Sequence, residues 1–236
     1  MLKLELVEAV LARALKGGAD FAEVYAQRAK KRRMKVRQGA LEEALSGLDY
    51  GAGVRLFFGT EVVYAYTNDL TQEGLMEALE TLLRAKGALG KVDEGGKGGL
   101  DFRKATPKGL HAPKVPYGEK DKRYRLERLL EAEAGARIAP AIKQVEASLL
   151  EWEEEVLVAN TEGVFAEEKR VRTRLFVLAV AQDGAEVQTG YSAPGKSVGL
   201  ELFDLYPPKA VGEKAARQAL TNLKARPAPA GTFPVV

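Results

Sequence analysis

The sequence predicts an α+β protein made of two successive units, each consisting of a helix, an antiparallel strand meander and a second helix. Three observations support this prediction. Apolar residues at helical spacing flank stretches of strand-like alternation, first near the N-terminus and again after residue 119. The connections between the expected strands are short, and the long helical crossovers that join parallel strands are missing. Between the two patterns the chain becomes rich in glycine and proline, which is typical of a linker or long loop.

Residues 1–88 form the first predicted unit. It opens with a helix whose apolar residues recur at helical spacing and which ends at Gly17-Gly18. About four antiparallel strands are expected next, with turns at Gln38-Gly39 and at Gly59-Thr60-Glu61. Asp69 or Thr71 is expected to cap a second helix. The strand-like stretches are residues 23–27, 33–37, 41–48, 54–58 and 62–66.

Residues 119–226 form the second predicted unit, and residues 89–118 are the expected linker or loop. Helical spacing covers residues 119–138, and a last helix is expected to open at Pro207-Pro208, where the first turn tolerates proline. No residue-level repeat relates the two units, so duplication of one unit is a hypothesis only. The expected strands are residues 142–150, 156–159, 171–182 and 186–191, with a turn at residues 160–163.

The composition narrows the possible chemistry. The chain has 236 residues, of which 46% are hydrophobic and 29% charged, so it can bury a core and keep a charged surface. Its net charge of +3 gives no strong attraction to nucleic acid or to an anionic membrane. Cysteine is absent, which excludes disulfides and thiolate catalysis. Because His111 is the one histidine, a histidine-rich zinc site cannot be built from this chain alone.

The ends and the apolar runs predict a cytoplasmic location. The N-terminus already reads as an amphipathic helix and lacks the layout of a signal peptide. The longest apolar run, residues 175–181, is far below the roughly 20 residues that a membrane span needs.

One stretch fits the G-x-x-x-x-G-K-[ST] pattern of phosphate-binding loops, namely Gly190-Tyr191-Ser192-Ala193-Pro194-Gly195-Lys196-Ser197. Such a loop needs a buried strand before it and a helix that begins at the lysine, so that the helix N-terminus faces the phosphate. Here the preceding residues are polar, and residues 198–203 alternate like a strand. A glycine-rich surface loop is therefore favoured, with a nucleotide site as the alternative.

Residues 28–37 carry seven lysines or arginines in ten positions, which raises the possibility of nucleic-acid binding. Alternation, however, places Met34 and Val36 on one face and Arg33, Lys35 and Arg37 on the other. No aromatic residues are interleaved for base stacking. A solvated strand face is the favoured interpretation.

Four glutamates surround Trp152, at positions 151, 153, 154 and 155. Clustered carboxylates can bind hard cations, but these lack a spacing that would wrap a metal ion. A solvated strand end or turn is favoured. We therefore predict no catalytic, cofactor-binding or metal-binding residue in this chain, and the residues alone indicate no reaction.

Three segments in order carry a resemblance to a known family. The first runs from Gly51-Ala52-Gly53-Val54-Arg55-Leu56 to residues 63–71. The second is Val158-Ala159-Asn160-Thr161-Glu162-Gly163, followed by residues 186–190 and 200–204. The third is Ala225-Arg226-Pro227-Ala228-Pro229-Ala230-Gly231-Thr232-Phe233-Pro234-Val235-Val236. Together they resemble the TldD/PmbA family, also called modulators of DNA gyrase, and the ending is closer to the TldD branch.

The resemblance implies a function for the intact protein. In that family a strand like residues 234–236 opens a catalytic domain, and a zinc-binding His-Glu-x-x-x-His helix follows. Residues 227–236 would then begin a catalytic domain that this chain lacks, and the chain itself is expected to be an inactive N-terminal portion. The intact protein would be a zinc-dependent peptidase in which the metal activates water and the glutamate acts as base. It would cleave unfolded peptides together with a PmbA/TldE-like partner subunit or a second copy of itself.

Two other functions remain open at this point. A regulatory or binding module could act on DNA gyrase or nucleic acid through the basic strand, and would show salt-dependent DNA binding. A nucleotide-binding protein could use residues 190–197. Within the leading hypothesis, we expect an exposed strand edge of the meanders to hold extended peptide.

Overall fold

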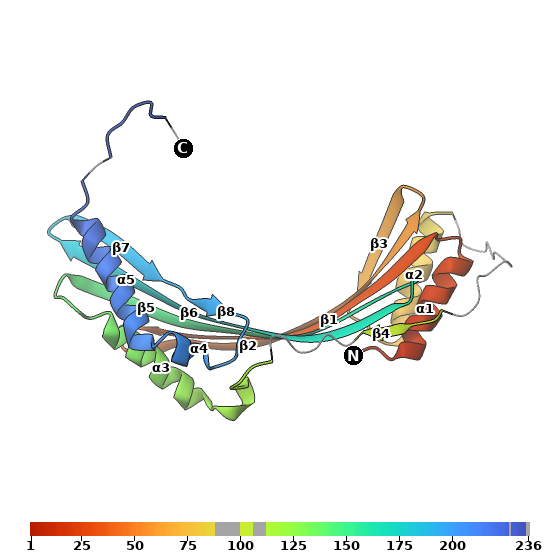
Figure 1. Cartoon of the computed structure of the whole chain (residues 1–236), viewed down its shortest axis with the longest axis horizontal. Coiled ribbons are helices and arrows are strands. Elements are labelled where there is room, and N and C mark those ends of the chain that lie inside the picture. Colours follow the sequence, from red (N-terminus) through yellow and green to blue (C-terminus); the bar gives the residue numbers. More distant parts are fainter. Residues whose placement is uncertain (88–99, 106–111, 227, 235–236) are drawn as a thin grey trace. The chain divides into compact units, whose positions relative to one another are not determined.

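The computed structural model describes residues 1–87, 100–105, 112–226 and 228–234 (Figure 1). The helices of the described ranges are α1 (Leu4–Lys16), α2 (Gln72–Ala85), the 3₁₀ turn η1 (Tyr117–Glu119), α3 (Lys122–Gly135), α4 (Leu202–Leu205) and α5 (Pro208–Leu223). The strands are β1 (Phe21–Arg37), β2 (Ala40–Phe58), β3 (Glu61–Thr67), β4 (Arg103–Ala105), β5 (Ile142–Asn160), β6 (Val164–Asp183), β7 (Glu186–Ser192) and β8 (Gly195–Lys196). None of these helices is long and apolar enough to cross a membrane.

The strands pair in the order β3-β2-β1-β5-β6-β4, and β7 and β8 also pair with β6. The β2–β3, β6–β7 and β6–β8 pairs are antiparallel, whereas the short β4 runs parallel to β6. β1 and β5 are antiparallel too, because Ala22 bonds to Thr161 at one end and Gln38 bonds to Val145 at the other. The predicted α+β class is confirmed.

The strands are longer than predicted. β1 joins the stretches at 23–27 and 33–37, β2 joins 41–48 and 54–58, and β5 joins 142–150 and 156–159. The predicted breaks between these stretches were wrong. The charged residues at these predicted breaks reduce the hydrophobic alternation. Residues of neighbouring strands neutralise their charge, so each strand continues without interruption.

The turns and caps follow the predictions closely. Gln38 and Gly39 both have positive φ, at 52° and 76°, as the two central residues of a tight type I′ hairpin turn require. Residues 161–163 connect β5 to β6. Of the two proposed caps, the Thr71 side chain accepts the N–H of Gly74, while Asp69 Oδ1 accepts the N–H of Thr71.

Two compact units divide the chain, and neither is one continuous stretch. Unit 1 consists of Met1–Lys31, Ser46–Ala112 and Trp152–Val171, and unit 2 of Arg32–Leu45, Pro113–Glu151 and Arg172–Val236. The predicted stretches 1–88 and 119–226 therefore each supply strands to both units. Much of the predicted linker, residues 89–118, and His111 within it lie outside the described residues.

The core of unit 1 lies between its sheet and the pair α1 and α2. Both helices turn an apolar stripe to the sheet, and the alternate residues Ala22, Val24 and Ala26 of β1 meet them from the other side. The fully buried side chains include Val7, Leu11, Leu56, Leu75, Leu79 and Leu83. The helices therefore cover one face of this sheet.

In unit 2, α3 and α5 lie side by side (Figure 1). Small residues let their backbones approach: a Cβ added at Gly212 would stand 2.0 Å from the carbonyl oxygen of Ala132. α5 packs in turn on β7, where a Cβ at Gly190 would stand 2.2 Å from the backbone nitrogen of Ala219. Gly190 and Gly212 are thus fixed by helix packing.

Candidate functional site

The structure contradicts the phosphate-loop interpretation of residues 190–197. Gly190 lies within β7 against α5, and Gly195 and Lys196 form β8, which pairs with Arg174 and Thr173 of β6. No helix begins at Lys196, as a phosphate-binding loop would require. The favoured alternative, a surface loop, was also incomplete, because most of the stretch is strand.

The basic stretch of β1 is a paired strand face. Met34 and Val36 are buried, as predicted, and the basic residues alternate with them. Lys35 Nζ lies 2.7 Å from Glu42 Oε2, and Arg37 Nη2 lies 2.9 Å from Glu146 Oε2. Arg33 also pairs with Glu43. Carboxylates of β2 and β5 therefore neutralise much of the charge that a nucleic acid would need.

The prediction of a solvated strand end at residues 151–155 was wrong. These residues lie inside β5, and Glu151 and Glu154 are only 2% and 5% exposed. Glu151 accepts two hydrogen bonds from Arg125, at 2.5 and 3.2 Å. Glu154 Oε2 accepts from Gln27 Nε2 at 2.6 Å and from the indole N–H of Trp152 at 3.1 Å.

These pairings leave no fit for a metal ion. Within the described ranges, no group of three or more His, Asp or Glu residues is arranged to hold one. In the most acidic segment, residues 151–155, three carboxylates bond to Arg125, Gln27 and Lys169. We therefore derive no metal-dependent step from this chain.

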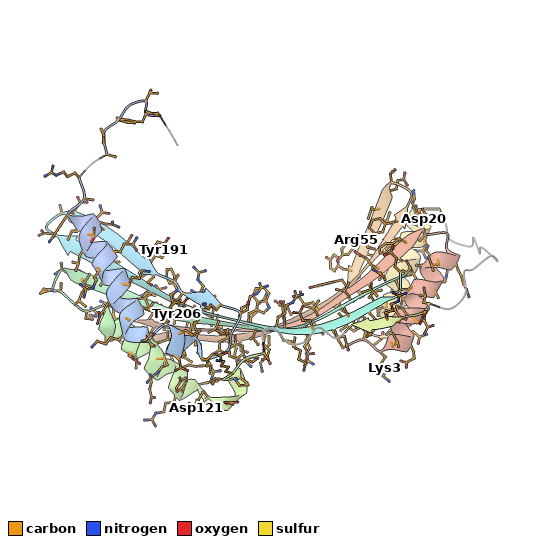
Figure 2. All side chains as sticks on the ribbon, viewed as in Figure 1. Lys3, Asp20, Arg55, Asp121, Tyr191 and Tyr206 are labelled. Carbon is orange, nitrogen blue, oxygen red and sulfur yellow. The ribbon has the colours of Figure 1, made fainter. Side chains whose placement is uncertain are left out.

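The most site-like surface is the face of the unit 1 sheet opposite α1 and α2, which we call the open face. In β1, Tyr25 alternates with the buried Val24 and Ala26, so it points to this side. In β3, Tyr64 lies opposite Arg55 of β2 and Tyr66 opposite Gly53. Figure 2 labels Arg55, which projects from the side of the sheet away from the two helices.

A cavity of about 570 Å³ opens on this face, near the end of the β2–β3 pairing. Four tyrosines line it, Tyr25, Tyr50, Tyr64 and Tyr66, and they are 41% to 81% exposed. The remaining lining residues are small or polar: Gln27, Asp49, Gly51, Ala52, Gly53, Thr67 and Asn68. Its volume lies within the range of about 300–1,000 Å³ that is usual for ligand sites.

A side chain at Gly53, on the floor of this cavity, would displace Tyr64. A Cβ added at Gly53 would stand 2.4 Å from the Tyr64 hydroxyl and 2.6 Å from its ring. The Tyr64 ring therefore lies directly over the Gly53 backbone. Arg55 holds a second side of the same ring, with its guanidinium carbon 5.9 Å from the centroid. The ring is fixed from two directions.

Burial and a neighbouring charge act on the hydroxyl of one tyrosine of this cavity. Burial raises the pKa of Tyr25, the nearby Glu154 carboxylate raises it further, and Arg170 opposes this in part. Tyr25 thus remains a protonated donor at neutral pH. Glu154 itself is satisfied by Gln27 and Trp152.

β3 is the terminal strand of the sheet order, and β2 is its one strand neighbour in the described part of the chain. Its inward residues Val63 and Ala65 pack on the core, while Val62, Tyr64 and Tyr66 are exposed. An edge of this kind presents backbone N–H and C=O groups to an added strand. The edge and the tyrosine cavity share Tyr64, Tyr66 and Thr67.

A second cavity, of about 590 Å³, lies in unit 2 between β7 and α5. Tyr191 and Tyr206, both labelled in Figure 2, line it together with Lys214. The Tyr191 ring stacks on Phe176, at 6.2 Å between centroids. Its lining contains a cation and no carboxylate, which is the reverse of the cavity in unit 1.

The tyrosine cavity was missed from the sequence. A signal was present in Val62-Val63-Tyr64-Ala65-Tyr66, where aromatic residues alternate with small apolar ones and so point away from the core. The contributions of Tyr25 and Tyr50 could not be seen, because they depend on which strands become neighbours.

Comparisons with known proteins all relate this chain to one family. Residues 22–86 match the model of the PmbA/TldA metallopeptidase domain 1, and residues 113–223 match that of the PmbA/TldA metallopeptidase central domain. A metalloprotease TldD homolog of Haemophilus influenzae is 29% identical over 92% of this chain. A metalloprotease of Methanothermobacter thermautotrophicus is 26% identical over the same share. The chain spans 46% of the length of each relative.

Solved structures share the fold. A protein of Thermotoga maritima, described as a modulator of a DNA gyrase, superposes with a TM-score of 0.72 at 16% identity, over 96% of this chain and 50% of its own. TldE of Thermococcus kodakarensis superposes with a TM-score of 0.66 at 17% identity, over 91% of this chain and 47% of its own. Together, the two domain matches and the shared fold show that this chain belongs to the PmbA/TldD family of metallopeptidases.

Proposed function

We propose that this chain is the N-terminal scaffold and substrate-chamber region of a TldD-like metal-dependent peptidase that cleaves unfolded peptides. The observation that carries the proposal is the match of metalloproteases along 92% of this chain, which covers only 46% of their length. The chemistry would then belong to a region beyond residue 236. We propose zinc as its metal by resemblance, and residues 227–236 as the start of the catalytic domain.

The role proposed for this chain is to hold substrate. Unfolded peptides expose backbone groups that a sheet edge can pair with, whatever their sequence. β3 offers such an edge, and the tyrosine cavity lies beside it. A peptide that extends the sheet beyond β3 would place alternate side chains on the open face.

The proposed partner is a TldE-like subunit or a second copy of this chain. Support comes from the fold that this chain shares with TldE of Thermococcus kodakarensis. Size-exclusion chromatography with light scattering, on the longer protein alone and mixed with a TldE-like protein, tests this. Monomers in both samples would contradict it.

Peptide binding can be tested without altering the protein. Two series of N-methylated peptides would be made from one unstructured sequence, one methylated at its odd-numbered residues and the other at its even-numbered residues. A peptide added to a strand uses the N–H groups of every second residue. We expect one series to lose binding to the 236-residue chain and the other to bind like the unmodified peptide, in a calorimetric titration.

Equal binding of both series would contradict strand addition. Peptide binding by two proline variants of β3, Val62→Pro and Val63→Pro, gives a second measurement. Proline removes the backbone N–H, and only one of these two neighbouring N–H groups points outward, so only the loss of that group should weaken strand addition directly. Circular dichroism would show that the variants remain folded.

The peptidase assignment has its own test, the coding sequence that follows residue 236. Continuation into a His-Glu-x-x-x-His helix is expected, and the longer protein should then bind metal and hydrolyse unfolded peptides. A stop codon directly after Val236 would contradict the assignment for this molecule.

A further inference from the structure

We propose that the tyrosine cavity of unit 1 is a binding site for a cationic group, the ammonium or guanidinium of a lysine or arginine side chain. The peptide form of this proposal rests on the proposed function, since it places a basic side chain of the bound peptide in the cavity beside β3. The site is defined by the lining residues given above, four of which are tyrosines.

The composition of the lining selects for positive charge. Aromatic rings present a negative π face, and a cation within about 6 Å of a ring centroid is attracted to it. Tyr25, Tyr50, Tyr64 and Tyr66 supply four such rings, and Asp49 supplies a carboxylate. Lysine and arginine are absent from this lining. An anionic ligand would meet the π faces and Asp49 without a compensating cation.

One ring of the cluster already has a cation beside it. The Arg55 guanidinium lies 5.9 Å from the Tyr64 ring centroid. Arg55 is neutralised by Glu23, whose Oε1 lies 2.9 Å from Nη1. The resident cation therefore adds little net positive charge to repel an incoming one. Tyr66, at 81% exposure, is the ring most open to a ligand.

The Asp49 carboxylate can leave its partner Lys31 for a ligand cation with little loss of stability. It pairs with Lys31 at 2.6 Å, but both side chains are about half exposed or more. Exposed ion pairs of this kind contribute little to stability. Lys31 has a second contact, because its Nζ lies 4.7 Å from the centroid of the Trp152 ring. A ligand ammonium could therefore take Asp49 while Lys31 stays over Trp152.

The floor and the position of the cavity suit a side chain that enters from a neighbouring strand. Gly51 and Gly53 line the cavity without a side chain, and the Tyr64 ring lies over Gly53. Tyr64, Tyr66 and Thr67 belong to β3, the strand that a peptide would extend. Alternate side chains of that peptide would then face the rings, so the position of a basic residue in the peptide would set its register.

Calorimetric titration of the 236-residue chain tests the site. Three acetylated and amidated peptides would differ at one central residue, lysine, norleucine or glutamate. Tetramethylammonium chloride would serve as a cation without a peptide backbone. The variants are Tyr66→Leu, which removes a ring, Tyr66→Phe, which keeps it, and Asp49→Asn. Tyr206→Leu, in the cavity of unit 2, is the matched control.

We expect the lysine peptide to bind more tightly than the norleucine and glutamate peptides. One exposed cation–π contact corresponds to roughly a twofold to fivefold change in affinity, so Tyr66→Leu should weaken lysine-peptide binding by about that factor. Tyr66→Phe should weaken it less than Tyr66→Leu, Tyr206→Leu should leave it unchanged, and Asp49→Asn should weaken it.

Equal affinities for the three peptides, or an unchanged affinity in Tyr66→Leu, would overturn the cation site while leaving strand addition intact. Failure of all peptides, with tetramethylammonium binding that Tyr66→Leu weakens, would support the cation site for free cations and contradict the peptide-binding role. Absence of binding by all probes would overturn both.

Discussion

Arg125 is a buried cation of unit 2 with partners on three elements. It is 7% exposed, holds Glu151 with two hydrogen bonds, and donates to the carbonyl oxygens of Tyr117, Lys120 and Asp121. Its planar guanidinium reaches four groups at once, which a lysine ammonium could not do. This one residue ties η1 and the start of α3 to β5.

Replacing Arg125 by methionine should strongly destabilise the protein. Glu151 would keep only Arg32, at 3.6 Å, and a buried carboxylate with a missing partner typically costs about 3–5 kcal/mol. Urea unfolding measures the loss. The double variant Arg125→Met with Glu151→Leu removes both charges and should lose less than the single variant. A double variant that is less stable than the single one would contradict the unpaired-charge explanation.

Gly190 provides a second prediction for a single residue. A methyl group there would collide with the α5 backbone at Ala215 and Ala219, so Gly190→Ala should lower the free energy of unfolding by about 1–3 kcal/mol.

Lys196→Ala, in the same phosphate-loop-like pattern, should leave stability unchanged. In a titration with ATP, neither the native chain nor Lys196→Ala should bind. ATP binding that Lys196→Ala abolishes would restore the nucleotide interpretation.

At the level of elements, local signals predicted the four long helices and the turns, whereas strand length depended on distant partners. The short helix α4 was missed, because residues 198–203 were expected to alternate like a strand. Thr71 and the Gln38-Gly39 turn act within a few residues of themselves, so their sequence identifies them. Residues 151–155 look like a strand end because they are so acidic. Their partners Arg125 and Gln27 lie on other elements, and only the fold shows that β5 continues through them.

The attachment of residues 114–115 to α4 should depend on pH. Burial of the Glu201 carboxyl opposes its ionisation, but the backbone N–H groups of Lys114 and Val115, at 2.9 and 3.0 Å, outweigh that effect, and its pKa lies below the usual value. A carboxyl whose pKa is lowered by folding stabilises the protein above its unfolded pKa, about 4.3 for glutamate. That contribution is lost as the pH falls through the folded pKa.

Glu201→Gln tests this linkage. The two N–H groups bond to different carboxylate oxygens, so the NH2 group that replaces one oxygen leaves an N–H without its acceptor, and at pH 7 the variant should be less stable by about 1–3 kcal/mol. The difference from the native chain should begin to shrink as the pH falls below the unfolded pKa of about 4.3, and should keep shrinking until the folded carboxyl is protonated. Urea unfolding between pH 3 and pH 7 measures it. A constant difference across this range would mean that the carboxylate charge plays no part.

For the molecule as a whole, sequence reasoning gave the α+β class and the family, but it missed the candidate site. The tyrosine cavity takes Tyr25 from β1, Tyr50 from β2 and Tyr64 and Tyr66 from β3. Each tyrosine alone reads as an ordinary strand residue. Their convergence follows from strand order and register, which the pattern of one strand does not specify.

The composition of the compact units leads to a prediction about fragments. The predicted second unit, residues 119–226, is one continuous stretch, yet unit 2 also contains Arg32–Leu45. That segment supplies the buried Met34 and Val36 and the pairs of Lys35 and Arg37 with Glu146. Without it, β5 loses its neighbour β1 and exposes its edge.

Fragment 113–236 should therefore show little cooperative thermal unfolding by circular dichroism, whereas the full 236-residue chain should unfold cooperatively. A synthetic peptide of residues 32–45 should restore part of the transition, and a scrambled peptide of the same composition should not. A fragment that unfolds as cooperatively as the full chain would show that the consecutive division of the sequence, and not the compact units, describes how this protein folds.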